Sequence, residues 1–286
     1  MEKRINIIGE GSVELGQACS IGDNVTIIFP QPGSVRIGDY VALGDGVRMI
    51  VDGGTVQIGD WSTLHPNCLV MAEKYVKIGQ HGWFGQNTVI DGTGGLTIDD
   101  GVRVGMYSQL WTHVAAGEQI EGCTLYGKTP SHIGKDVWLV GSCVVGSGVS
   151  VGERVIALAG SNIVKDVPDH SVVAGAPAKV KEGLSFYREV SLTEKMQMLA
   201  GWLREMESIA LDAPNLSIED GLITVHFDSV EKVRFFENRA DYEAAERIAS
   251  ITDACIETKK YRKQFTKTER AVFKYLGGNK ARFYCD

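Results

Sequence analysis

One of the six histidines of this 286-residue chain stands where a regular sequence pattern stops. His113 ends the segment LWTH, and the six-residue repeat present on both sides resumes only at Ile133. Histidine has the side-chain pKa best suited to proton transfer near neutral pH, and long loops inside tight repeats are usually functional. We therefore predict that His113 is a general base and that residues 114–132 form a functional loop.

The remaining histidines are weaker candidates because a lone histidine is more often structural than catalytic. His132 lies at the far end of the same loop, and we expect it at the surface or behind the reacting groups. His65 and His81 are expected at solvent-facing corners, and His170 lies in a turn after DVPD. Histidines 65, 81, 113 and 132 form no short H-x₄-H pair, so no metal site is predicted.

The elements that must position His113 are short strands in a six-residue repeat. Each hexad begins with an aliphatic residue, usually followed by Gly, and has a small or β-branched residue at its fifth place, as in IGDYVA LGDGVR. Eighteen residues make three hexads, so each coil has three flat sides, which indicates a solenoid of short parallel strands with the lead and fifth-place residues inward. The lead residues of successive coils are Ile37, Ile58, Ile78, Ile98, Ile133, Val151 and Asp169.

Composition and cysteine placement exclude several classes of protein. A hydrophobic fraction of 44% with 23% charged residues is typical of a globular protein, and neither a signal peptide nor a membrane span is evident, so we expect a cytoplasmic location. Residues 1–183 hold 13 basic and 19 acidic residues, which argues against nucleic-acid binding. No CxxC pair occurs, and Cys19, Cys68 and Cys143 occupy fifth places, so they are predicted to be packed, reduced thiols.

Glycine content divides the chain in two, because 30 of the 34 glycines precede residue 184. We predict a β-helix over 1–183 and a small α+β domain over 184–286. In the second domain, SLTEKMQMLAGWLREMES predicts an amphipathic helix, and GLITVHF and VEKVRFF predict a hairpin joined through DSVE. Two further helices are expected in DYEAAERIASITDACIETKKYRK and TKTERAVFKYLGG.

A basic stretch lies near the end of this second domain. Between Lys259 and Arg282 there are nine basic residues and a single acid, with four aromatic residues interleaved: Tyr261, Phe265, Phe273 and Tyr275. One interpretation is a solvated helix face whose aromatic rings pack inward. The other is a binding face for a polyanion, a phosphorylated lipid carrier or a membrane surface.

The repeat resembles that of the hexapeptide-repeat acyltransferases, which implies a left-handed parallel β-helix and a homotrimer with active sites between subunits. The run LWTH, a loop, YGK, a proline and IGKDVWLVG is similar to the sugar O-acetyltransferase branch, which includes galactoside and maltose acetyltransferases and enzymes that modify lipopolysaccharide and capsule. The resemblance implies acetyl-CoA as the donor, a sugar hydroxyl as the acceptor in surface polysaccharide biosynthesis, and His113 as the catalytic histidine.

The same resemblance implies roles for other positions. Trp138 corresponds to a tryptophan that lines the acceptor and thioester site, and Asn87 corresponds to an asparagine that binds a sugar hydroxyl. Val164 and Lys179 stand where relatives often have Thr and Arg. The positions implied for the acetyl-CoA site are Gly141, Ser142, Ala159, Gly160, Lys165 and Lys179.

Other activities remain open at this point. A histidine base serves an amine as well as a hydroxyl, so amino-sugar N-acetylation is an alternative. A non-catalytic β-helix that binds or scaffolds another molecule is a second alternative, although it leaves the loop and His113 without a purpose. The sequence does not decide the acceptor, the length of the acyl group, the contribution of His132 or the role of the last hundred residues.

Overall fold

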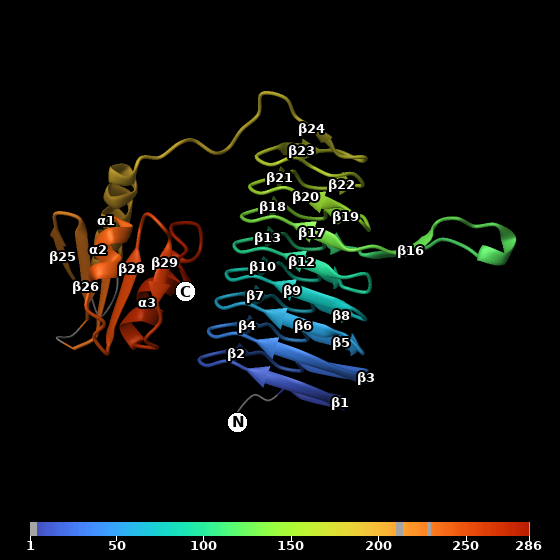
Figure 1. The fold of residues 1–286 in the computed structure, drawn as a ribbon, viewed down its shortest axis with the longest axis horizontal. Coiled ribbons are helices and arrows are strands. Elements are labelled where there is room, and N and C mark those ends of the chain that lie inside the picture. Colours follow the sequence, from blue (N-terminus) through green and yellow to red (C-terminus); the bar gives the residue numbers. More distant parts are fainter. Residues whose placement is uncertain (1–4, 210–213, 228–229, 286) are drawn as a thin grey trace. The chain divides into compact units, whose positions relative to one another are not determined.

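The computed structural model describes residues 5–209, 214–227 and 230–285 (Figure 1). The chain divides into two units, Met1–Phe186 and Tyr187–Asp286, with the division just after the predicted boundary at 183/184. Within the described ranges, no helix combines the length and the apolar character needed to span a membrane.

The first unit is a parallel β-helix built from two long sheets. The path through the larger sheet is β20 (Ser150–Val151), β17 (Ser131–Ile133), β12 (Leu96–Ile98), β9 (Tyr75–Ile78), β6 (Thr55–Ile58), β3 (Thr26–Ile37), β5 (Arg48–Asp52), β8 (Leu69–Ala72), β11 (Val89–Asp91), β14 (Gln109–Leu110), β19 (Val144–Val145) and β22 (Asn162–Ile163), with β1 (Asn6–Leu15) beside β3. The smaller sheet is β2 (Ser20–Ile21), β4 (Ala42–Leu43), β7 (Thr63–Leu64), β10 (Trp83–Phe84), β13 (Arg103–Val104), β18 (Trp138–Leu139), β21 (Ile156–Ala157), β23 (Val172–Ala174) and β24 (Lys179–Val180).

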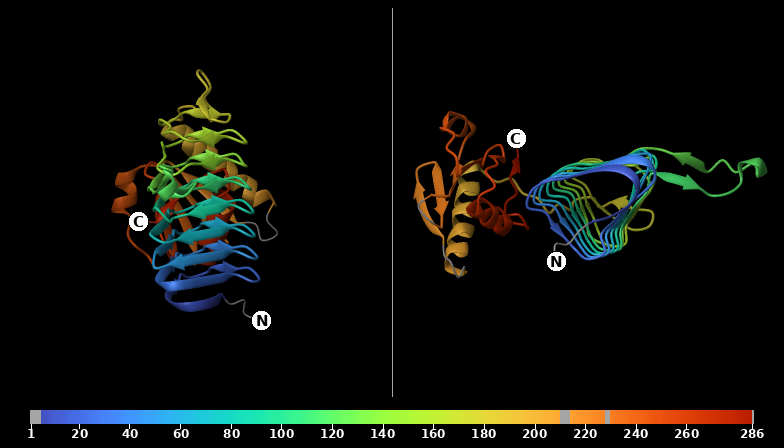
Figure 2. Two further views of the ribbon diagram at one scale, coloured as in Figure 1. Left: turned by 90° about the vertical axis from the view of Figure 1, so that its right-hand side faces the viewer. Right: turned by 90° about the horizontal axis from the view of Figure 1, so that it is seen from below.

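These sheets form three faces, as the end-on view of the coil shows (Figure 2). Strand β3 pairs with β5 through its first half and with β6 through its second half, so the larger sheet covers two of the faces. We call the side with β6, β9, β12, β17 and β20 the first face, the smaller sheet the second face, and the side with β5, β8, β11, β14, β19 and β22 the third face. The predicted mainly β fold with a β-helix is confirmed.

Inward-pointing aliphatic residues stack from coil to coil and form one continuous core. The lead residues from Ile37 to Val151 are all buried, as predicted. The seventh lead position was wrong, because Asp169 is exposed and Val167 takes its place, bridging to Val151 and 7% exposed. Asp169 instead accepts a hydrogen bond from the backbone N–H of Glu153, so VPD repeats the IGD pattern with proline in place of glycine.

The cysteine prediction is confirmed, since Cys68 and Cys143 are 0% exposed and Cys19 packs against the core. The expectation of a solvent-facing ring was wrong for His81 and was met only in part for His65, which is half-buried. Each occupies a corner, but the His81 ring stacks on Trp61 and is only 7% exposed, and the His65 ring contacts another tryptophan. Corner side chains of successive coils lie about one strand spacing apart, roughly 4.8 Å, so flat rings cover one another.

The predicted loop leaves the β-helix as a projecting hairpin (Figure 1). Strand β15 (His113–Ala115) pairs antiparallel with β16 (Tyr126–Lys128), and a 3₁₀ turn, η1 (Gln119–Glu121), lies at the far end. The chain rejoins the first face at β17. We call residues 114–128 the hairpin arm, and it carries Ile120 with 89% of its surface exposed.

Over its described residues, the second unit consists of a six-stranded sheet and three helices. The strand order is β25 (Asn215–Glu219), β26 (Leu222–His226), β27 (Lys232–Phe236), β28 (Ile251–Cys255), β29 (Lys260–Arg262) and β30 (Tyr284–Cys285), and the helices are α1 (Leu192–Ile209), α2 (Arg239–Ala244) and α3 (Lys267–Leu276). Helices α1 and α3 and the antiparallel pair β26–β27 agree with the predictions, although Asp228 and Ser229 of the expected turn lie outside the described residues.

The helix predicted over residues 241–263 was wrong. Helix α2 ends at Ala244, and the chain then forms β28 parallel to β27, followed by β29. Residues 252–255 are all buried as the interior strand of the sheet. Pairing on both sides of this strand outweighs the weak helical propensity that the sequence suggested.

Candidate active site

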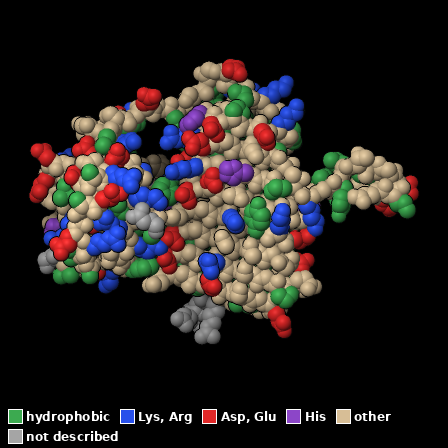
Figure 3. Space-filling model, viewed as in Figure 1, with side chains coloured by type: hydrophobic (Ala, Val, Ile, Leu, Met, Phe, Trp, Pro, Cys, Tyr) green, Lys and Arg blue, Asp and Glu red, His purple; other side chains and the backbone are tan. Residues whose placement is uncertain are grey.

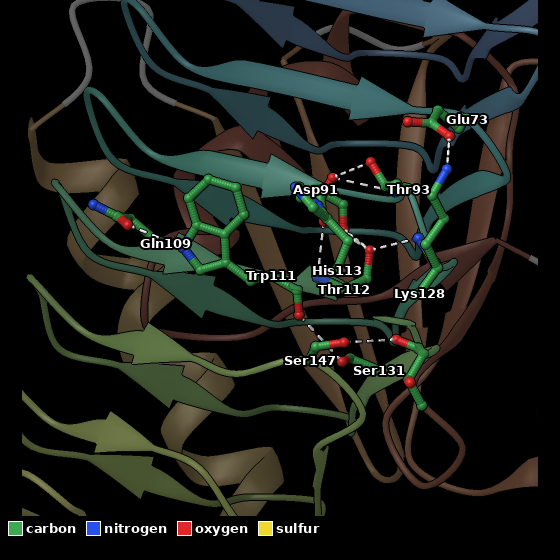
Figure 4. Close-up of polar contacts among 12 residues, drawn as sticks. Glu73, Asp91, Thr93, Gln109, Trp111, Thr112, His113, Lys128, Ser131 and Ser147 are labelled. Carbon is green, nitrogen blue, oxygen red and sulfur yellow. Dashed lines mark hydrogen bonds and ion pairs between the residues drawn. The ribbon is translucent and has the colours of Figure 1, made fainter. Parts of the chain in front are cut away.

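The candidate active site is centred on His113, at the edge where the hairpin arm leaves the coil between the third and first faces. Strand β11 ends with Asp91 on the preceding coil, directly beside the start of β15. The Nδ1 atom of His113 lies 2.9 Å from Oδ2 of Asp91 (Figure 4). The Asp91 side chain is 0% exposed, whereas the His113 side chain is 36% exposed. A buried carboxylate therefore holds a histidine that solvent reaches.

Two threonines satisfy the buried carboxylate of Asp91. Thr93 donates to Oδ1 through its hydroxyl at 2.6 Å and its N–H at 3.2 Å, and the N–H of Thr112 donates to Oδ2 at 2.8 Å. Burial raises the pKa of Asp91, but the hydrogen bonds from Thr93, His113 and Thr112 outweigh it and lower that pKa below its ordinary value.

This environment selects one form of the imidazole. An ionised carboxylate can only accept hydrogen bonds, so Nδ1 of His113 carries a proton and donates a hydrogen bond to Asp91. In the neutral ring Nε2 then keeps its lone pair, which is the form a general base requires.

Other side chains fix the position of the His113 ring and the base of the arm. Trp111 meets the ring edge-on with centroids 5.6 Å apart, and its indole N–H donates to Oε1 of Gln109 at 3.0 Å. Lys128, which faces His113 across the hairpin, forms an ion pair with Glu73 (Figure 4). The arm is thus tied to the preceding coils where it begins and ends.

Most of the other predicted residues lie along a second edge, between the second and third faces. Asn87, Ser142 and Gly160 occupy equivalent corner positions with left-handed backbone, at φ of 58°, 48° and 72°. The N–H of Gly160 donates to the carbonyl of Gly141, so the corners of adjacent coils touch. We call this the glycine edge, and it includes Ala159, which is exposed.

Side chains beside the glycine edge are open to solvent. Trp138 on β18 is 43% exposed and pairs in register with Arg103. A Cβ added at Gly160 would meet no atom within 4 Å, so the surface there is free for a ligand. The N–H of Ser142 is already used, because it donates to the carbonyl of Met106 at 2.9 Å.

The structure does not bring every predicted residue together. His113 lies on one edge and Trp138 beside the other, with the third face between them. Lys165 and Lys179 are both exposed near the last coils, Lys165 at the turn after β22 and Lys179 on β24. His132 contacts Asp99, with Nε2 and Oδ2 2.9 Å apart, and takes no part in the hydrogen bonds around Asp91.

Sequence reasoning missed Asp91, Thr93 and Thr112. A signal was present, because Asp91 stands where the two preceding coils have Met71 and Ile50. It also precedes His113 by 22 residues, close to the length of one coil, which places the two side chains on neighbouring coils. An acid that replaces an apolar residue one coil before a candidate base therefore indicates a hydrogen-bond partner for that base.

Comparisons with known proteins place the chain in a family, although no family model matches it. Nodulation protein L of Rhizobium meliloti (strain 1021) is 31% identical over 144 residues, which cover 49% of this chain and 78% of that protein. The chain belongs to the hexapeptide-repeat acetyltransferase family. The prediction of an acyltransferase is confirmed at this level.

The chain is also similar to two proteins with different named acceptors. The crystal structure of the polySia-specific acetyltransferase NeuO has a TM-score of 0.56 and 22% identity, covering 65% of this chain and 89% of that one, which shows the shared fold. The 2,3,4,5-tetrahydropyridine-2,6-dicarboxylate N-acetyltransferase of Clostridium perfringens (strain SM101 / Type A) is 41% identical over 69 residues, which cover 24% of this chain and 29% of that protein.

Proposed function

We propose that this hexapeptide-repeat acetyltransferase transfers the acetyl group of acetyl-CoA directly to a sugar hydroxyl, with His113 as the general base. The observation that carries the proposal is the contact between Nδ1 of His113 and the buried carboxylate of Asp91. That contact occupies Nδ1 and leaves Nε2 as the basic nitrogen of a side chain that is 36% exposed.

In the proposed chemistry His113 takes up one proton and later gives it back. Nε2 of His113 takes the proton of the acceptor hydroxyl while the hydroxyl oxygen bonds to the carbonyl carbon of the thioester. The C–S bond then breaks, and the thiolate of coenzyme A leaves and receives the proton that His113 holds. The negative charge of Asp91 stabilises the imidazolium that exists between these steps, as in other histidine–carboxylate pairs.

The oxyanion that forms on the thioester carbonyl needs a fixed hydrogen-bond donor. Gly141 and Ser142 are the candidates from the sequence, and the N–H of Ser142 already donates to Met106. We therefore assign the N–H of Gly141 to this role, because it has no partner among the residues that the structure describes.

The donor site that we propose follows the glycine edge. Ala159 and Gly160 are exposed there on the coil after Gly141, and glycine without a neighbouring side chain lets the pantetheine arm approach the backbone. Lys165 and Lys179 are exposed cations that can compensate the phosphates of the nucleotide. Exposed backbone along the edge and two cations near its end suit an extended phosphorylated ligand.

A homotrimer would bring the two edges together. The third face presents apolar neighbours outward in register, Leu69 beside Val89 and Ile50 beside Met71, and Gln109 lies between Val89 and Val144. The first face instead presents Gln57 and Lys77 outward. An apolar sheet face on a chain of this kind needs a cover, and a second copy supplies one. We propose that His113 of one subunit then faces Trp138 and Gly141 of the next.

The acceptor that we propose is a hydroxyl of a glycan in surface polysaccharide biosynthesis. The support is the resemblance of LWTH, YGK and IGKDVWLVG to sugar O-acetyltransferases. A second candidate is N-acetylation of an amino sugar, and the 41% identity over 69 residues to an N-acetyltransferase supports N-acetylation as a reaction, although the acceptor named for that protein is no sugar. His113 could deprotonate either kind of acceptor.

One experiment separates these activities. The purified protein is given acetyl-CoA with a panel of neutral sugars, amino sugars and polysaccharides, and thiol release is followed for each. An O-acetyl product is cleaved by hydroxylamine and an N-acetyl product is not. Thiol release that depends on a sugar and yields a hydroxylamine-sensitive product is expected. A hydroxylamine-resistant product would favour the second candidate, and no sugar-dependent release across the panel would overturn the proposal.

A further inference from the structure

Helix α3 of the second unit presents three cations in a row. Lys267, Arg270 and Lys274 are exposed, and their spacing of three and four residues places them on one side of the helix. The opposite side holds the buried residues Val272 and Phe273. At 1.5 Å per residue the cations are spaced by about 4.5 and 6 Å along the helix axis. We call these three residues the α3 ridge.

The cations of the α3 ridge form no direct ion pair in the described structure, and the acid next to the first turn of α3, Glu231, accepts hydrogen bonds from Thr268. Other basic residues of this unit do have acidic partners: Arg234 and Arg262 share Asp253, and Lys280 pairs with Glu205. Among the described residues, none of the three ridge cations has an ion-pair partner.

The acid within α3 does not neutralise this surface. Glu269 is 0% exposed and accepts hydrogen bonds from the hydroxyl of Thr252 at 2.7 Å and the N–H of Gln264 at 2.6 Å. Its carboxylate therefore serves the interior of the unit. In Figure 3, Lys and Arg side chains gather on the visible face of this unit, in the region of α3.

An exposed aromatic ring adjoins the ridge. Of the aromatic residues in the basic stretch, Tyr261 and Phe273 are packed in the core at 0% and 4% exposed, whereas Phe265 is 41% exposed. Phe265 also has left-handed backbone, with φ of 58°, which is costly for a bulky residue and persists where the surroundings fix it. The ammonium of Lys263 lies 5.3 Å from the centre of its ring.

We propose that Phe265 and the α3 ridge bind an anionic polysaccharide, the acceptor class of the acetyltransferase, an inference that rests on the proposed function. The ridge cations would bind carboxylates or phosphates along the glycan, and a sugar ring would lie on the face of Phe265. The first unit, with 13 basic and 19 acidic residues over 1–183, repels such a chain, so acceptor capture needs a separate basic surface.

A linear polymer fits this surface better than a lipid bilayer does. The cations form a single row, and Phe265 is the sole exposed large apolar residue between Lys259 and Arg282 in the described structure. Binding to a membrane surface draws on a broad apolar face as well as on cations. The α3 ridge lacks such a face, whereas one ring beside a row of charges suits a charged sugar chain.

The test uses the full chain and measures binding by calorimetry to polygalacturonate, neutral dextran and vesicles that contain phosphatidylglycerol. The ridge variant K267E/R270E/K274E is compared with a control, K195E/R204E/R247E, which changes three exposed cations of the same unit by the same charge. We expect the ridge variant to bind polygalacturonate on the order of tenfold more weakly, since each exposed ion pair contributes a modest amount. The control is expected to bind as the wild type does.

Two further variants guard against misfolding and test the ring. K267Q/R270Q/K274Q removes the charge without reversing it and should give a smaller loss of affinity, and F265A should weaken binding without changing its dependence on salt. Thermal unfolding is followed for each variant. Equal losses in the ridge and control variants, or binding to vesicles but not to polygalacturonate, would overturn the proposal.

The failure of this inference can be told apart from that of the proposed function. If the protein binds polygalacturonate through the ridge but acetylates no sugar, the proposed function is wrong and the binding surface stands. If acetylation of sugars is measured while the ridge variant binds and acetylates polygalacturonate as the wild type does, the inference about the ridge is wrong.

Discussion

The Oδ2 atom of Asp91 lies 2.9 Å from Nδ1 of His113, and 22 residues of chain separate the two. Consecutive coils of the β-helix create this pair, because strand β11 ends directly beside the start of β15. The solenoid therefore supplies a fixed carboxylate, and the first residue of β15, from which the hairpin arm leaves the coil, is the accessible base. The pair between Asp91 and His113 therefore requires both the regular repeat and the point at which that repeat is interrupted.

Replacement of His113 by alanine should lower kcat by roughly 10²–10⁴-fold, the usual contribution of a general base. The dissociation constant for acetyl-CoA, measured by calorimetry, should stay close to that of the wild type. His132→Ala is the matched control, because His132 contacts Asp99 on the first face and lies outside the Asp91 hydrogen bonds. A His113→Ala enzyme with most of its turnover would show that another group is the base.

Asp91→Asn should lower kcat by roughly 10²-fold or more while KM for the acceptor changes little, because the ring orientation and the imidazolium both lose their stabilising charge. The double variant with His113→Ala should be no slower than His113→Ala alone, since the two residues act as one unit. Steady-state kinetics of the three variants measure this. Independent, multiplicative losses would mean that Asp91 acts on the reaction by some route other than His113.

The β-helix could be predicted from the sequence because the residues that determine each coil are close together in the chain and recur in every repeat. Inward residues such as Ile58 and Val151 recur at a fixed place in each hexad, so their burial follows from the period alone. The error at Asp169 arose where proline replaces glycine and the coil is shorter than 18 residues, so the fixed spacing between lead residues no longer holds. In the second unit, residues 251–255 form a strand because of neighbours distant in sequence, and no local pattern reports such neighbours.

The candidate site was less accessible to sequence reasoning. His113 was marked by the interrupted repeat, but its partner Asp91 becomes apparent only when one coil is laid on the next. The stacking of His81 on Trp61 has the same origin. Contacts between coils depend on the number of residues per coil, which varies with each corner insertion, so such pairs follow from the register and not from the motif.

Acid should unfold a Thr93→Val variant at higher pH than the wild type. Hydrogen bonds lower the pKa of Asp91 from 3.8, so its ionised form stabilises the fold above that value, and this stability is lost as the pH falls through the lower folded pKa. Without the Thr93 hydroxyl the folded pKa rises, and less of the stabilisation remains. Circular dichroism against pH gives the midpoints, with Thr97→Val on the first face as the control. Identical midpoints for the two variants would contradict this account of Asp91.

Charge on the third face should dissociate the assembly. Leu69→Asp with Val89→Asp places two carboxylates at neighbouring apolar positions of the face that we assign to the subunit contact, and burying unpaired charge there is costly. Light scattering after gel filtration should show monomers. Gln57→Asp with Thr97→Asp, on outward positions of the first face, should leave the mass unchanged. A monomeric wild type, or an intact trimer after the third-face changes, would rule out this interface.

Mixed assemblies test whether the site spans two subunits. His113→Ala and Trp138→Ala chains, each expected to be nearly inactive, are unfolded together and refolded as a mixture. If His113 of one subunit faces Trp138 of the next, some subunit boundaries in a mixed trimer hold His113 from a Trp138→Ala chain and Trp138 from a His113→Ala chain. Those sites are complete, so the activity of the mixture should rise well above that of either parent. A mixture of His113→Ala with Asp91→Asn is the control, because those side chains meet within one chain at 2.9 Å and an intact pair exists in neither parent. Recovery in the first mixture alone places His113 and Trp138 on opposite sides of a subunit boundary, whereas no recovery there would confine the site to a single chain.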